Sequence, residues 1–425
     1  MHIKPLRYLI AVAALAGTAL YGQPFSSGST GSDGAYSPTV SGDFEIGSLN
    51  AAGDNVFHFT TINIPAGVTI RLKGSKLRNK AVTWLASGAV TIAGTLDLSG
   101  ASAIDFNTNS GAPAISAARV PPDPGPGGYT GGLGLRGGVA PEPGAGPGGG
   151  PGGTGSSLYA CMGGPGSFIW PGPGTTSGIV VGPTYGSYLA IPLYGGSGGG
   201  GGNGATNSVG GVGGAGGGAI RIISSTTITV SGVINANGGT GSSPGGSIGG
   251  CQGGPGTGGT IHLVAPTIAG GGQMTVQSGS HPYGATFTGL IRLSADTFSY
   301  TGIPSEGTTQ GRRVHGPLFV PPANSTLAEP SVRITQINGA AVPTSPKGEY
   351  LRPDVIINAS TPVTVNVEAK NMPLTAAVKL RVTSETAGDQ LVDCVALSGS
   401  SATSTTTCSA TFPFSISISA LRATW

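Results

Sequence analysis

The chain has 425 residues, of which only 9% are charged and 80 are glycine, and its formal net charge is +3. The glycines follow no strict three-residue period, which excludes collagen. So small a net charge, without a recognition-helix or RNA-module signature, argues against nucleic acid as a partner.

The first 22 residues have the pattern of a secretory signal. A short basic start is followed by an apolar run. At about 12 residues this run is too short to span a bilayer comfortably. We therefore expect a signal peptide at 1–22, an N-terminal cap at 23–55, and a mature chain that is secreted or held at the cell surface without a membrane span.

A repeat of strand-like runs begins at residue 56. Each copy holds two or three short runs that alternate with period two and are rich in Val, Ile and Thr, which is typical of strands. One copy cannot bury its apolar side alone, so we expect the copies to stack as a parallel β-solenoid over 56–316, with strands about 4.8 Å apart. The full copies span 56–74, 82–100, 219–238 and 260–279, and a fainter one spans 290–302.

Two glycine-rich insertions interrupt the repeat, at 107–218 and 239–259, and the first holds 40 of the 80 glycines. Such a composition usually gives a flexible chain, because it buries too little surface to offset its ordering entropy. The alternative is a set of extended, polyproline-II-like segments bonded to one another through their backbones. Interspersed aromatic residues favour partial order, and the sequence leaves both states open.

The composition changes after a proline-containing linker at 317–330. Glycine becomes less frequent, charges of both signs appear, and six or seven short strand-like runs follow between 331 and 425. This spacing predicts an immunoglobulin-like β-sandwich. The expected fold is therefore all-β: a parallel, β-helix-like solenoid with long glycine-rich insertions, followed by a sandwich.

Four cysteines in an exported chain favour disulfides over metal thiolates. Cys394 and Cys408 lie close together in the predicted sandwich, so we expect them to pair. Cys161 and Cys251 each lie in a glycine-rich stretch and are assigned to one another by elimination only.

The sequence offers no catalytic or metal site. No Asp or Glu occurs between residues 143 and 295, whereas glycoside hydrolysis normally needs two carboxylates. The glycine runs also lack the Asp of calcium-binding β-rolls. We therefore expect no catalytic residues, no metal and no cofactor.

One outward position of the first strand carries polar residues in successive copies: His58, Thr83, Arg221, His262 and Arg292. In register, these would form a weakly cationic strip that binds an anionic polysaccharide or another cell-surface polymer. Alternatively, an exposed strand position simply accepts any polar residue. On the first interpretation, the candidate ligand-binding residues are His58, Arg221, His262 and Arg292.

The stretches GGAGGGAIRIISSTTITVSGVINANGG and GGPGTGGTIHLVAPTIAGGG resemble a pattern, GGxGGAIRLxAPTI…GxIxANGG, of exported glycine-rich repeat proteins of environmental bacteria. The resemblance covers roughly residues 25–300. It implies an exported repeat scaffold and assigns no activity and no catalytic residues.

These features predict a secreted or cell-surface structural and adhesive scaffold, of the kind found in an extracellular matrix, without catalytic activity. Unpaired strands at the ends of a solenoid would also allow self-association. The alternative is an extracellular β-helix protein that binds or cleaves polysaccharides.

Overall fold

The computed structural model is all-β and contains no α-helix in the residues that it describes; η1 (Ser75–Leu77) is a single 3-10 turn. The predicted signal peptide and residues 319–330 of the predicted linker lie outside the described residues. The described residues are 25–50, 53–104, 120–135, 139–155, 160–169, 179–205, 209–244, 250–280, 288–302, 312–318, 331–344, 346, 353–358, 362–370, 372, 374–384, 390–412 and 419–424.

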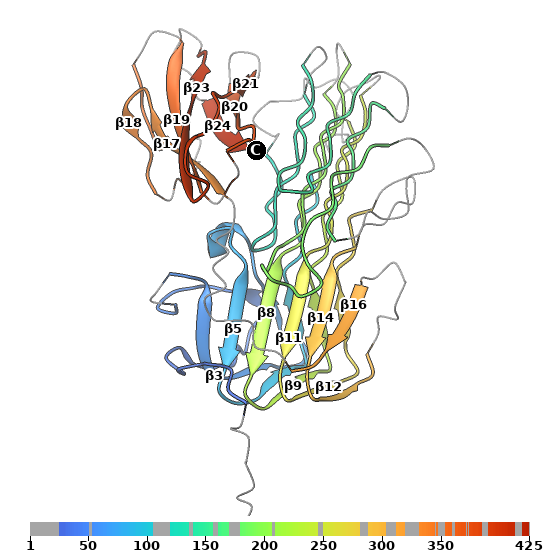
Figure 1. Ribbon diagram of the computed structural model, residues 1–425. Coiled ribbons are helices and arrows are strands. Elements are labelled where there is room, and N and C mark those ends of the chain that lie inside the picture. Colours follow the sequence, from blue (N-terminus) through green and yellow to red (C-terminus); the bar gives the residue numbers. More distant parts are fainter. Residues whose placement is uncertain are drawn as a thin grey trace, which may run out of the picture.

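Two parallel sheets form the base of the molecule (Figure 1). The larger has eleven strands in the order β15-β12-β9-β6-β3-β5-β8-β11-β14-β16, with β1 paired to β3 beside this path, and the smaller has the order β13-β10-β7-β4-β2. Their strands are β1 (Gly34–Tyr36), β2 (Gly42–Asp43), β3 (Val56–Ile64), β4 (Thr69–Arg71), β5 (Val82–Ala86), β6 (Val90–Ile92), β7 (Thr95–Asp97), β8 (Ala219–Ser224), β9 (Thr227–Val230), β10 (Val233–Asn235), β11 (Thr260–Val264), β12 (Thr267–Gly270), β13 (Gln273–Thr275), β14 (Leu290–Ser294), β15 (Thr297–Tyr300) and β16 (Arg312–Gly316).

Successive copies of the repeat are parallel neighbours, as predicted. Strands β5, β8, β11 and β14 follow one another on one side of β3, and β6, β9, β12 and β15 follow one another on the other side. The register is unbroken from copy to copy, and Ile220 pairs with Ile261, which pairs with Ile291. The larger sheet is therefore curled, and the long strand β3 belongs to both of its halves.

The apolar positions of the copies form one core between the two sheets. Ile228, Ile234 and Ile261 have no exposed surface. At the N-terminal end the core is aromatic, and the ring centroids of Phe44 and Trp84 lie 5.3 Å apart. Each large side chain buried in this way contributes about 1.5–3 kcal/mol, so the stack is stabilised mainly by contacts between copies.

The described residues of the glycine-rich insertions form a bundle of extended segments that continues upward from the parallel sheets (Figure 1). An extended helix with three residues per turn presents every third residue to the same neighbour. The central segment, 195–203, exchanges backbone hydrogen bonds with six neighbouring segments. It donates to 209–218, 139–146 and 160–169, and it accepts from 128–135, 148–155 and 250–259. Gly195 also donates to Gly127, which directly precedes 128–135.

Glycine is required in this bundle because the backbones lie so close together. Gly199 donates to the carbonyl of Gly214 at 3.0 Å and accepts from the amide of Gly132 at 2.8 Å. A Cβ atom added at Gly199 would lie closer than 3.0 Å to the carbonyl oxygen of Gly254. The described part of the insertions is therefore the ordered alternative, held together by backbone hydrogen bonds.

The C-terminal part consists of two antiparallel sheets, ordered β18-β17-β19-β23-β22 and β21-β20-β24. Val365 and Leu380, from different sheets, lie in one buried core. Arg381 joins this part to the glycine-rich bundle, because its Nη1 lies 2.8 Å from Oε2 of Glu142 and both side chains are buried. The strands are β17 (Ser331–Ile337), β18 (Ala340–Ala341), β19 (Val363–Lys370), β20 (Lys379–Ser384), β21 (Gln390–Asp393), β22 (Ser398–Gly399), β23 (Thr403–Ala410) and β24 (Ser419–Thr424).

Candidate functional site

The two disulfides join the cysteine pairs that the sequence predicts. Cys161 is bonded to Cys251, and Cys394 is bonded to Cys408. The first disulfide links two segments of the glycine-rich bundle that are 90 residues apart in the sequence. The second lies at the core of the C-terminal sheets, where Cys408 is buried.

Three of the four candidate ligand-binding residues form a row across the larger sheet. Arg221 on β8 pairs with His262 on β11, which pairs with Arg292 on β14. The prediction for His58 was wrong in register, because Val56 takes the place beside Thr83 and His58 pairs with Leu85. A shift of two residues leaves every side chain on its predicted face, which is why the sequence pattern did not reveal it.

The row is not exposed, which corrects the expected cationic strip. Arg221 is 8% exposed, His262 0% and Arg292 5%. A part of the first glycine-rich insertion, residues 185–194, covers them. Arg221 Nη2 donates to the carbonyl oxygen of Ala190 at 2.6 Å, and Arg292 Nη1 donates to that of Tyr188 at 2.8 Å. The sequence could not show this cover, because it comes from a segment without apolar periodicity.

Burial sets the electrostatics of the row. Arg221 Nε donates to Nδ1 of His262 at 3.2 Å, and Nε2 of that ring lies 3.3 Å from the Ser294 hydroxyl. Desolvation, followed by the charges of Arg221 and Arg292, holds the pKa of His262 well below its usual value. Desolvation also lowers the pKa of Arg221 to about 10. The two guanidinium groups thus hold the covering segment through Ala190 and Tyr188, with a neutral imidazole between them, and the row is left without open surface for a polymer.

The other half of the larger sheet has an open outer face, which sequence reasoning missed. We call the outward residues of β6, β9, β12 and β15, with Asn63 of β3, the threonine face. The pairing aligns them in two columns. Alternation within TIT (227–229) and TIA (267–269) is the signal in the sequence that could have revealed this face. The columns are Thr227, Thr267, Thr297 and Asn63, Thr91, Thr229, Ala269, Ser299.

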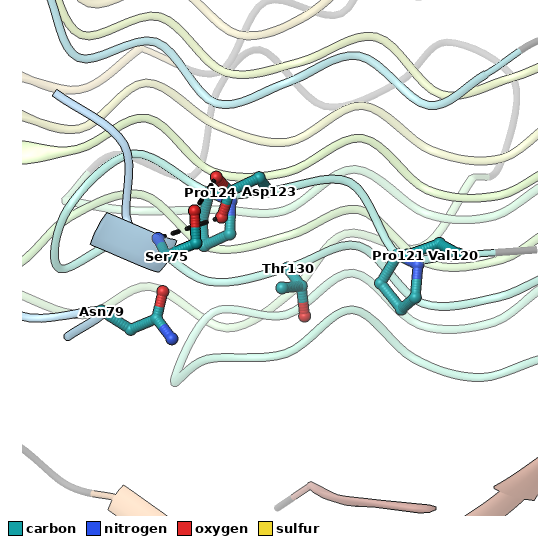
Figure 2. Close-up of a pocket in the computed structure, with 7 residues that line it drawn as sticks. All are labelled: Ser75, Asn79, Val120, Pro121, Asp123, Pro124 and Thr130. Carbon is teal, nitrogen blue, oxygen red and sulfur yellow. Dashed lines mark hydrogen bonds between the residues drawn. The ribbon is translucent and has the colours of Figure 1, made fainter. Parts of the chain in front are cut away.

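A depression of about 440 Å³ lies where η1 meets the glycine-rich bundle (Figure 2). Asp123 is the acidic residue of this depression. Its carboxylate accepts hydrogen bonds from the backbone amide of Ser75 at 3.2 Å and from the Ser75 hydroxyl at 2.6 Å. This carboxylate therefore holds the wall of the depression together, and no second carboxylate is among the described lining residues. The lining residues are Ser75, Asn79, Val120, Pro121, Asp123, Pro124 and Thr130.

No protein-family profile, curated protein or solved structure matches this chain. In the described part of the chain, no helix has the length and apolarity needed to cross a membrane. Among the same residues, no group of three or more His, Cys, Asp or Glu side chains could hold a metal ion.

Proposed function

We propose that the chain is a secreted or cell-surface scaffold with a structural and adhesive role and no catalytic activity. The observation that carries this proposal is the glycine-rich bundle, in which a segment such as 195–203 is bonded to six others through its backbone. At about 3.1 Å per residue, its nine residues form a rod about 28 Å long. A stiff projection of this kind suits a protein that holds two surfaces apart or builds a layer.

We also propose the finer fold assignment: a β-solenoid at the base and an immunoglobulin-like sandwich at the C-terminus. The parallel, in-register pairing of the copies supports the first. Two antiparallel sheets around one core support the second. The sequence resemblance to exported glycine-rich repeat proteins of environmental bacteria agrees with the solenoid.

Export is supported by the predicted signal at 1–22 and by the two disulfides, which persist in oxidising compartments. We place adhesion away from the row of Arg221, His262 and Arg292, because these side chains lie beneath 185–194. An anionic polysaccharide or another cell-surface polymer, or a second copy of the chain, would have to dock elsewhere on the surface.

The test is a retention assay with the purified mature protein. Beads that carry the protein are mixed with bacterial cells and with a panel of soluble and insoluble polysaccharides, and the same panel is assayed for new reducing ends. The proposal predicts retention without product. New reducing ends above the no-protein blank would instead support a polysaccharide-cleaving enzyme, and a cytoplasmic chain with an intact N-terminus would refute export.

A further inference from the structure

The threonine face is a regular, open surface of the base. Thr227, Thr267 and Thr297 pair directly across β9, β12 and β15, and Thr91 pairs with Thr229 in the second column. Neighbouring strands are about 4.8 Å apart and successive outward residues of one strand are about 6.6 Å apart. The face is therefore a two-dimensional array with a fixed repeat in both directions.

The array is available to a ligand. Thr227, Thr229 and Thr267 are half-buried, while Thr297 and Ser299 are exposed. Within the described residues, no protein group forms a hydrogen bond with the side-chain hydroxyls of Thr229, Thr267 or Thr297. The opposite half of the same sheet shows the contrast, because its polar row is covered by 185–194 and bonded to it.

The chemistry of the array limits what it can bind. Neither column contains a charged residue, so the complementary surface is uncharged. A soluble small molecule or sugar would need a concave site with a few convergent polar groups, whereas this face is an open sheet. Phe298 of β15 pairs with the buried Ile268, so it belongs to the inward-facing row and not to the threonine face. The face therefore lacks an aromatic platform for a glycan ring.

We propose that the threonine face binds ice. In a water crystal the oxygen positions are fixed and repeat in two directions, so a hydroxyl array with a fixed repeat can take the place of one layer of lattice waters. Each threonine adds a methyl group that fills the space between these hydroxyls. A single contact is weak, but the strands are already ordered by pairing with their neighbours, so the array binds without a large entropic cost.

The experiment uses the full mature protein. Binding of the fluorescently labelled protein to single ice crystals is imaged, and inhibition of ice recrystallisation is measured in a second assay. Thr267 is the test position, because it lies at the centre of its column between Thr227 and Thr297. Thr267→Lys should raise the concentration needed to stop recrystallisation by about tenfold, equivalent to about 1.4 kcal/mol. Thr267→Val, which keeps the shape and removes the hydroxyl, should show a smaller loss.

The matched control is Gln273→Lys, because Gln273 is an exposed residue of β13 in the smaller sheet and the added charge is the same. Both lysine variants should unfold within a few degrees of the wild type. Wild-type protein that neither labels ice nor slows recrystallisation would overturn the proposal. Equal losses in the two lysine variants would also overturn it, as would retention on crystalline cellulose or chitin without any effect on ice. Failure on ice leaves the retention assay of the scaffold unaffected, so the two proposals fail separately.

Discussion

Replacing Gly199 by alanine tests whether the glycine-rich bundle is held by close backbone packing. The new methyl group would lie closer than 3.0 Å to the carbonyl oxygen of Gly254, so one segment must move. Overpacking of this kind costs about 1–3 kcal/mol. The movement also weakens the hydrogen bonds that Gly199 makes with Gly214 and Gly132, at about 0.5–1.5 kcal/mol each. Restricting the unfolded chain returns about 0.4–1 kcal/mol, so we expect a net loss of about 1–6 kcal/mol.

The assay is urea unfolding with the disulfides intact, followed by near-ultraviolet circular dichroism of the aromatic residues. Gly42→Ala is the control, because Gly42 has no atom within 4 Å of an added Cβ and does not have a positive φ. Its free energy of unfolding should stay within about 0.5 kcal/mol of the wild-type value. An unchanged midpoint for Gly199→Ala would refute the close packing of the bundle.

Three further predictions concern buried groups. Burial depresses the pKa of His262, so the unfolded chain binds a proton at this residue more readily than the folded chain does. The free energy of unfolding should therefore fall as the pH drops below about 6.5. His262→Gln should make the free energy of unfolding less dependent on pH in this range, and an unaltered dependence would contradict the prediction. Replacing Cys161 and Cys251 by serine opens a loop of 90 residues and should cost up to about 4.7 kcal/mol. This should appear as a lower unfolding temperature, which reducing agent then changes only through the remaining Cys394–Cys408 disulfide. Glu142→Gln leaves Arg381 without its buried carboxylate and should cost about 3–5 kcal/mol; calorimetry should then show the C-terminal sheets unfolding earlier, whereas a single unchanged transition would exclude a role for this ion pair in joining the two parts.

The sequence by itself determined the strand content, the copies and their inward faces. Alternation with period two places Ile220, Ile261 and Ile291 on one side of their strands, and a stack of copies buries all three whatever the exact register. The cysteine pairing could also be predicted from the sequence, because two of the four cysteines are close in the sequence and the other two then remain for each other.

Only the tertiary structure decided the state of the glycine tracts and the exposure of the polar row. Glycine carries no side chain whose pattern could report a neighbour, so the six contacts of 195–203 depend on segments brought together from the whole insertion. The same insertion supplies the carbonyls that cover Arg221 and Arg292, which turned a predicted surface into an interior. The threonine face was left open because no segment of the described chain packs over it, and that is a property of the folded arrangement rather than of any local sequence.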